Sequence, residues 1–166
     1  MFKQIARFLV TGLWLNLLPD SPPQVSVGKK AWIFPISEGL AQFTDGKTWY
    51  HVRSYPDKAP AYPQRYDWTG PFSQGLAAVK KDGQWFHIFE DGKPAYSQRY
   101  GWVGSFSQGL AVAKLIGNIW FHVRIDGTPA YKQRYSFVSS FSNGRALAWD
   151  GGKEEFYIRL DGTRIN

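Results

Sequence analysis

The stretch that decides the fold is residues 72–92, FSQGLAAVKKDGQWFHIFEDG. It holds two runs of strand-forming residues, 76–80 and 85–89, separated by Asp82-Gly83 and followed by Asp91-Gly92. An Asp-Gly pair between two such runs is typical of a tight β-hairpin, because glycine adopts the positive φ that the turn needs. The stretch therefore predicts two antiparallel strands with a tight turn after each of them.

This stretch is one copy of a repeat. Three blocks recur in fixed order: FSxGxA at 72–77, 106–111 and 141–146, W(F/Y)H at 49–51, 85–87 and 120–122, and AYxQRY at 61–66, 95–100 and 130–135. A partial copy of the first block stands at 36–41. Copies of the last block begin 34 and 35 residues apart (95 − 61 and 130 − 95). A fixed period of this length indicates a repeat array, and each copy predicts a third strand within the segment that corresponds to 96–103.

We expect an all-β array of about three and a half three-stranded meanders over residues 36–166. The repeats would form a solenoid-like or gently curved stack in which each contacts mainly its neighbours. A closed barrel or a small propeller is the alternative. No helical period of adequate length follows residue 30.

Residues 1–18 differ in composition from the rest of the chain. Lys3 and Arg7 precede an apolar run over 8–18, which is shorter than the roughly 20 residues that a membrane-spanning helix needs. We interpret 1–18 as a short helix that caps the first repeat, with an export signal or an anchor in contact with a membrane as alternatives. A cap favours a cytoplasmic protein, whereas a signal or an anchor implies export or membrane association. Residues 19–35 would form a linker and the first strand.

The repeated blocks resemble the WG-repeat (KWG) proteins, a bacterial β-repeat family. Their consensus runs roughly Phe-Ser-x-Gly-Leu-Ala-x-Val-x-x-x-Gly-x-Trp, followed by an Asp-Gly turn and a Pro-x-x-Tyr segment. Residues 72–85 fit this consensus closely, and the likeness covers about 36–166. The family's glycine after tryptophan is replaced here by Tyr50, Phe86 and Phe121, so the packing beside that strand must differ. The resemblance implies a β-repeat fold and a binding or interaction module without a defined activity.

Alternation along the second strand of each copy separates an apolar face from a face rich in rings and cations. Because rings beside cationic groups bind sugars, nucleobases and aromatic peptide side chains, this second face is the candidate ligand-binding stripe. Its members are Trp49, His51, Arg53, Trp85, His87, Trp120, His122 and Arg124. The structural alternative buries the tryptophans and pairs each histidine with a backbone carbonyl. The histidines occur once per repeat, so in an open array their nitrogens would not converge, and we expect no metal site.

The Gln-Arg-Tyr triplets also have two interpretations. Their arginines could form a ladder for an anionic polymer, or each arginine could bond a carbonyl or an Asp turn of the adjacent repeat and fasten the stack. We favour a structural role. The triplets are Gln64, Arg65 and Tyr66; Gln98, Arg99 and Tyr100; and Gln133, Arg134 and Tyr135.

Composition and repetition argue against catalysis. An active site is usually built once from unlike groups, whereas nearly every polar feature here occurs three times. The chain has no cysteine, which excludes disulfides and zinc–thiolate sites, and its net charge of +7 is scattered, so nucleic acid is not the expected partner. We therefore expect a non-catalytic module without a cofactor that binds a protein partner through a repeat surface. A carbohydrate or nucleotide-like ligand, small and anionic or a sugar, is the alternative.

Overall fold

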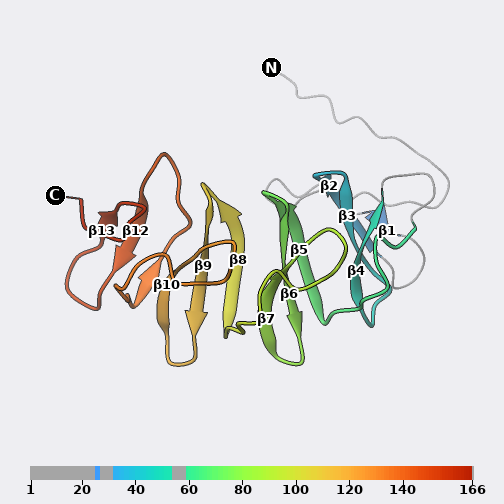
Figure 1. The fold of residues 1–166 in the computed structure, drawn as a ribbon, viewed down its shortest axis with the longest axis horizontal. Coiled ribbons are helices and arrows are strands. Elements are labelled where there is room, and N and C mark those ends of the chain that lie inside the picture. The colour runs from blue at the N-terminus through green and yellow to red at the C-terminus, as the bar shows by residue number, and fades with distance from the viewer. Residues whose placement is uncertain (1–24, 27–31, 54–58, 166) are drawn as a thin grey trace, which may run out of the picture.

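The computed structural model describes residues 25–26, 32–53 and 59–165. In this part of the chain, thirteen strands form four antiparallel sheets that follow one another in chain order (Figure 1). We call the sheets units 1 to 4. Unit 1 holds β1 (Val25–Ser26), β2 (Trp32–Ser37), β3 (Leu40–Thr44) and β4 (Trp49–Arg53). Unit 2 holds β5 (Trp68–Ser73), β6 (Leu76–Lys81) and β7 (Gln84–Ile88). Unit 3 holds β8 (Trp102–Ser107), β9 (Leu110–Leu115) and β10 (Ile119–Val123), and unit 4 holds β11 (Phe137–Val138), β12 (Ala146–Trp149) and β13 (Phe156–Ile158).

Unit 2 is built from two tight hairpins. Asp82 and Gly83 join β6 to β7 with φ values of 51° and 78°, the two positive angles of a type I′ turn. Gln74 and Gly75, at 57° and 78°, join β5 to β6 in the same way. The Ser-Gln-Gly block is therefore a turn, and each meander begins one strand earlier than predicted. The segment predicted as a third strand, 96–103, is divided, because 102–107 starts the next sheet.

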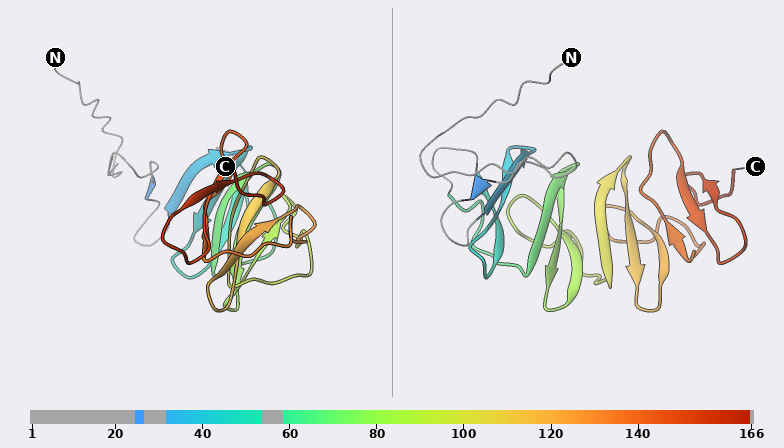
Figure 2. Two further views of the ribbon diagram at one scale, coloured as in Figure 1. Left: turned by 90° about the vertical axis from the view of Figure 1, so that its left-hand side faces the viewer. Right: turned by 180° about the vertical axis from the view of Figure 1, so that it is seen from behind.

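The segment between one unit and the next runs back along the last strand. In unit 2, Pro94 and Tyr100 bridge to Ile88 and Trp85, and units 1 and 3 have the equivalent pairs. Units 2 and 3 thus approximate the four-stranded blade of a propeller. The units nevertheless form an open row, with units 1 and 4 at opposite ends (Figure 2). The open stack is the form that the described residues adopt, with four units and no closed barrel.

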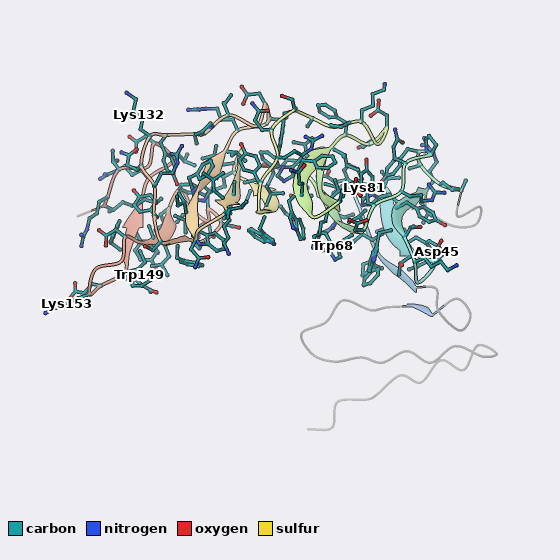
Figure 3. The ribbon with its side chains drawn as sticks, turned by 90° about the horizontal axis from the view of Figure 1, so that it is seen from below. Asp45, Trp68, Lys81, Lys132, Trp149 and Lys153 are labelled. Carbon is teal, nitrogen blue, oxygen red and sulfur yellow. The ribbon has the colours of Figure 1, made fainter. Side chains whose placement is uncertain are left out.

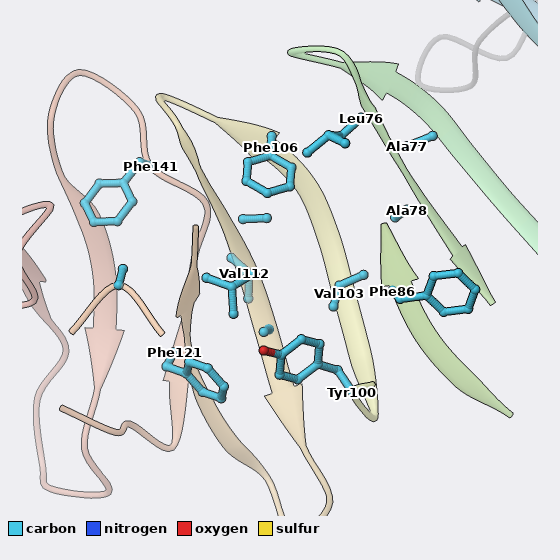
Figure 4. Close-up of a cluster of buried hydrophobic side chains, with 14 of the residues drawn as sticks. Leu76, Ala77, Ala78, Phe86, Tyr100, Val103, Phe106, Val112, Phe121 and Phe141 are labelled. Atoms are coloured by element: carbon cyan, nitrogen blue, oxygen red, sulfur yellow. The ribbon is translucent and has the colours of Figure 1, made fainter. Parts of the chain in front are cut away.

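The core lies between the sheets (Figure 4). On β7, Phe86 contacts Tyr66 of unit 1 with ring centroids 6.2 Å apart, while His87 contacts Phe106 of unit 3 at 4.6 Å. Both faces of the strand are therefore covered, because each inner sheet lies between two others. At the central strand positions the second face is therefore buried as well, as the structural alternative expects for the histidines.

Several predicted features fall at the start of the chain. The helix over 1–18 lies outside the described residues, as does most of the linker within 19–35. Strand β2 crosses the predicted start of the repeats at residue 36, so the first sheet begins upstream of it. The described part of the chain contains no helix that is long and apolar enough to cross a membrane.

Candidate functional site

The three histidines lie in the joints between units, and each is fully buried. The Nε2 atoms of His51, His87 and His122 lie 2.8, 2.8 and 2.9 Å from a carbonyl oxygen of the following unit, at Gly70, Gly104 and Ser139. A carbonyl oxygen can only accept, so Nε2 carries the proton and donates. Each Nδ1 then accepts from a tyrosine hydroxyl, that of Tyr62, Tyr96 or Tyr131.

Burial lowers the pKa of each joint histidine from 6.5 to about 4, although the carbonyl bond opposes the shift. The imidazoles are therefore neutral at pH 7, with both nitrogens paired inside the protein. They cannot reach a ligand on the surface, and their arrangement is the structural alternative stated above. Among the residues that the structure describes, no group of three or more His, Asp or Glu side chains is placed to hold a metal ion.

The Gln-Arg-Tyr triplets fasten the structure in two ways. Arg99 donates from Nη1 to the carbonyls of Tyr96, Ser97 and Gln98, and its guanidinium lies 3.8 Å above the ring of Phe86. Arg65 on Tyr50 and Arg134 on Phe121 repeat this arrangement, so the arginines hold the returning segment on its own unit. The contact with the adjacent unit that we had assigned to arginine is made by the tyrosines. Their hydroxyls donate to glycine carbonyls of the next Asp-Gly turn: Tyr66 to Gly92 (2.8 Å), Tyr100 to Gly127 (2.5 Å) and Tyr135 to Gly162 (2.6 Å).

The glutamines of the triplets make no comparable repeated contact. Gln64 is half-buried and its Oε1 has no partner, whereas Gln98 and Gln133 are exposed. A fourth arginine, Arg164, lies 4.4 Å above Phe156 in unit 4. Sequence analysis missed it because it follows Arg134 by 30 residues rather than 35 (164 − 134).

The arginines predicted for the stripe are separated from its tryptophans. Trp49 begins β4 and Arg53 ends it, and four residues at about 3.3 Å each place them about 13 Å apart. Arg124 stands just beyond β10 and donates to the carbonyls of Pro129 and Ala130. The structure therefore does not bring the predicted Trp, His and Arg residues together in one surface.

What it does form is a row of half-exposed rings along one long edge of the stack. Successive ring centroids are separated by 5.1, 6.3, 5.8 and 5.7 Å. We call this row, with the two lysines set in it, the Trp stripe; its members are Trp68, Lys80, Trp85, Trp102, Lys114, Trp120 and Phe137. Trp49 pairs with Phe34 at 5.3 Å in unit 1. In Figure 3, Trp68 and Trp149 lie along the same edge, and Lys132 lies along the opposite one.

Cross-strand pairing puts each lysine between two indoles. Lys80 is opposite both Trp68 and Trp85, and Lys114 is opposite both Trp102 and Trp120. The ammonium of Lys114 lies 5.2 Å from the Trp120 ring, within cation–π range. The described residues contain one salt bridge, Lys93 to Asp91, so neither stripe lysine is neutralised by a carboxylate there.

Sequence analysis identified Trp85 and Trp120 but missed their partners on the first strand of each sheet. The available signal was Trp-x-Gly. A Cβ on Gly70 or Gly104 would lie 3.0 Å from the indole of Trp68 or Trp102, because each ring lies back over its own strand. Glycine two residues after the tryptophan makes room for the ring.

Residues 62–85 match the family model described as "WG containing repeat". The matched segment is a WG repeat. The match confirms the predicted family and falls on the segment that links unit 1 to unit 2 and on most of unit 2. No curated protein matches the chain.

Among solved structures, this chain is similar to "KlHsv2 with loop 6CD replaced by a Gly-Ser linker", with a TM-score of 0.57 and 10% identity over 87% of this chain and 61% of that one. It is also similar to BamB from Moraxella catarrhalis (TM-score 0.45, 12% identity, 92% and 51% coverage) and to the computationally designed Ika8 protein (0.42, 9%, 85% and 59%). The chain thus spans between about half and three fifths of the length of these structures. At 10% identity the first likeness shows the fold alone, that of β-propeller-like neighbours.

Proposed function

We propose that this WG-repeat chain is a non-catalytic interaction module that binds a protein partner along the Trp stripe. The observation that carries the proposal is that the stripe has side-chain groups free to bind a partner. The histidines and tyrosines of the joints are paired internally, whereas the rings of the stripe stay half-exposed and its lysines have no carboxylate partner in the described residues.

The chemistry of the stripe suits a protein surface. Aromatic side chains are enriched at the cores of protein interfaces, since they give a large contact area at a small cost in conformational entropy. The row runs across units 2 and 3 and reaches Phe137 of unit 4, which fits an extended partner segment rather than a compact ligand. Lys80 and Lys114 favour acidic groups on that segment.

A sugar or a nucleotide base is the alternative occupant, because both stack on indoles. Neighbouring rings of the stripe are tilted relative to one another by 50° to 58°. This continuous packing leaves no pair of parallel faces between which a single base or sugar ring would fit. The inclination therefore favours the protein partner.

The electrostatics of the described residues support a non-catalytic role. The groups with strongly shifted pKa values that share a hydrogen bond are the joint histidines and their tyrosine partners; burial raises the pKa of Tyr62, Tyr96 and Tyr131 well above 10. Because these groups are paired with one another inside the joints, their pKa shifts follow from structural burial and need no catalytic explanation.

The test compares the full wild-type chain with a Lys80→Glu/Lys114→Glu variant, which reverses the stripe charges and keeps its rings. Phe89→Ala is the matched control, because Phe89 is 42% exposed beyond the other end of β7. Proteins captured from the native host are purified, and their affinity is measured by calorimetry. We expect a partner whose affinity falls at least roughly tenfold in the charge-reversed variant and is unchanged in the control. Equal affinity in all three proteins, or binding to a glycan array in place of any protein, would overturn the proposal.

A further inference from the structure

One hairpin departs from the repeat. In unit 2, β6 and β7 are joined by two residues, Asp82 and Gly83, whereas in unit 3 three residues, Ile116, Gly117 and Asn118, join β9 to β10. The polar residues that surround the unit 2 turn are replaced by Leu115, Ile116 and Ile119. Ile116 is 91% exposed and Ile119 is 40% exposed. We call residues 115–119 the unit 3 tip.

The fold does not require these aliphatic side chains. Gly117 and Asn118 supply the positive φ values of the turn, 88° and 60°. Ile116 is almost fully exposed and thus adds almost no buried apolar area to the protein. Ile116 and Ile119 lie close together at one turn, and apolar groups gathered on a surface mark contact sites.

The charged residues of the segment that carries the tip are all basic. The sequence contains no Asp or Glu from Gly92 to Ile125, a stretch that holds Lys93, Arg99, Lys114 and Arg124. Lys114 lies directly behind the tip, between the half-exposed indoles of Trp102 and Trp120. Inward from the tip, the aliphatic side chains are therefore followed by one level that holds two indoles and an ammonium.

That order matches the layers of a membrane surface. Aliphatic groups are stable in the acyl region, indoles at the interface, and lysines beside anionic headgroups. The β9–β10 hairpin ends at the lower margin of the stack in Figure 1. The tip is thus convex and projects outward, so it is shaped to enter a soft surface and not to receive a ligand.

We propose that the unit 3 tip docks the protein on anionic lipid surfaces, with Ile116 inserted and Lys114 paired with headgroup phosphates or carboxylates. This goes beyond the proposed protein partner and does not depend on it. An apolar pocket on a protein is the competing occupant. The absence of acidic residues over 92–125 favours lipid, because an anionic bilayer presents its charge all around an inserted tip.

The experiment is co-sedimentation of the full chain with phosphatidylcholine vesicles that contain or lack phosphatidylserine. Ile116→Asp is compared with Ile125→Asp, a matched control in the same unit, because Ile125 is 54% exposed beyond the opposite end of β10. Both variants keep residues 1–18, so any binding by that segment is common to all proteins. Trp fluorescence is recorded in parallel.

We expect binding to the anionic vesicles with a blue shift of Trp emission, and a loss of roughly tenfold or more in affinity for Ile116→Asp alone, as removal of one large buried apolar group predicts. Lys114→Gln should reduce the binding and its dependence on salt. No binding by the wild-type protein, or equal binding by Ile116→Asp and Ile125→Asp, would overturn the proposal. Loss of a protein partner by Ile116→Asp without any binding to vesicles would do the same and assign the tip to a protein interface.

Discussion

The buried joint histidines make the stability of the stack sensitive to mild acid. Each has a pKa of about 4 in the folded chain against 6.5 as its ordinary value. Because the pKa is lower in the folded state, each histidine contributes to the free energy of unfolding above pH 6.5, and this contribution is lost as the pH falls towards 4. The full difference of about 2.5 pKa units corresponds to about 3 kcal/mol per histidine. By pH 5 about 2 kcal/mol of it is lost, so three histidines together lose about 6 kcal/mol, a large part of the 5–15 kcal/mol typical of a protein.

The window between pH 6.5 and 5 isolates this effect. The groups that face each imidazole in hydrogen bonds are a tyrosine hydroxyl and a carbonyl, neither of which titrates there. The exposed carboxylates Asp45, Asp91, Asp126 and Asp161 have pKa values lowered from 3.8 by hydrogen bonds in their turns, so they titrate below the window.

The assay is urea unfolding followed by Trp fluorescence at pH 7.5 and pH 5. We expect the free energy of unfolding to fall by about 6 kcal/mol between them. In His122→Gln the amide can still donate to the Ser139 carbonyl but does not titrate, so this variant should lose about a third less stability over the same range. A transition midpoint that does not change with pH, or a pH dependence equal in wild type and His122→Gln, would refute the reasoning.

Three further predictions concern single joints. Gly127→Ala places a Cβ 2.4 Å from the Tyr96 ring at a φ of 76° and should cost about 2–4 kcal/mol in urea unfolding, whereas Gly109→Ala, with a φ of 80° and no atom within 4 Å, should cost about 1 kcal/mol. Tyr100→Phe leaves the Gly127 carbonyl without its buried partner and should cost about 1–3 kcal/mol in the same assay. Gly104→Ala should displace the indole of Trp102, which would appear as a change in Trp emission with a loss of stability of no more than about 1–2 kcal/mol.

Sequence analysis could predict the repeat, the strands and the Asp-Gly turns because these depend on local chemistry. It placed the start of each meander one strand too late, because Gln74 adopts a φ of 57°. A glutamine rarely takes this conformation, and the sequence gives no signal for it. From sequence alone, a Gln-Gly pair in this position indicates the end of a strand and not a tight hairpin turn. As a result, the strand predicted as the third of each copy is in fact the first strand of the next sheet.

The candidate stripe shows a second limit. Alternation correctly separates Phe86 from Trp85 and His87, but it cannot say that another sheet covers each face. Since the sheets stack, His87 is buried at the centre of its strand while Trp85, at the strand end, stays half-exposed. Partners from other strands, such as Trp102, depend on register between sheets, which no local pattern encodes. Position along the strand, more than the choice of face, decides which ring can meet a partner.

The contrast between repeated and unrepeated features carries the functional argument. The His–Tyr–carbonyl bonds, the Tyr–glycine bonds and the Arg–ring contacts occur in every joint or unit described, and each is explained by the need to fix a unit within the stack. The unit 3 tip has no such explanation, because its aliphatic residues replace polar ones at a turn that is complete without them. In a protein built of copies, selection for folding acts on all of them alike. Exposed isoleucines at this turn of unit 3, where the equivalent turn of unit 2 is polar, are therefore the strongest sign of a contact made outside the chain.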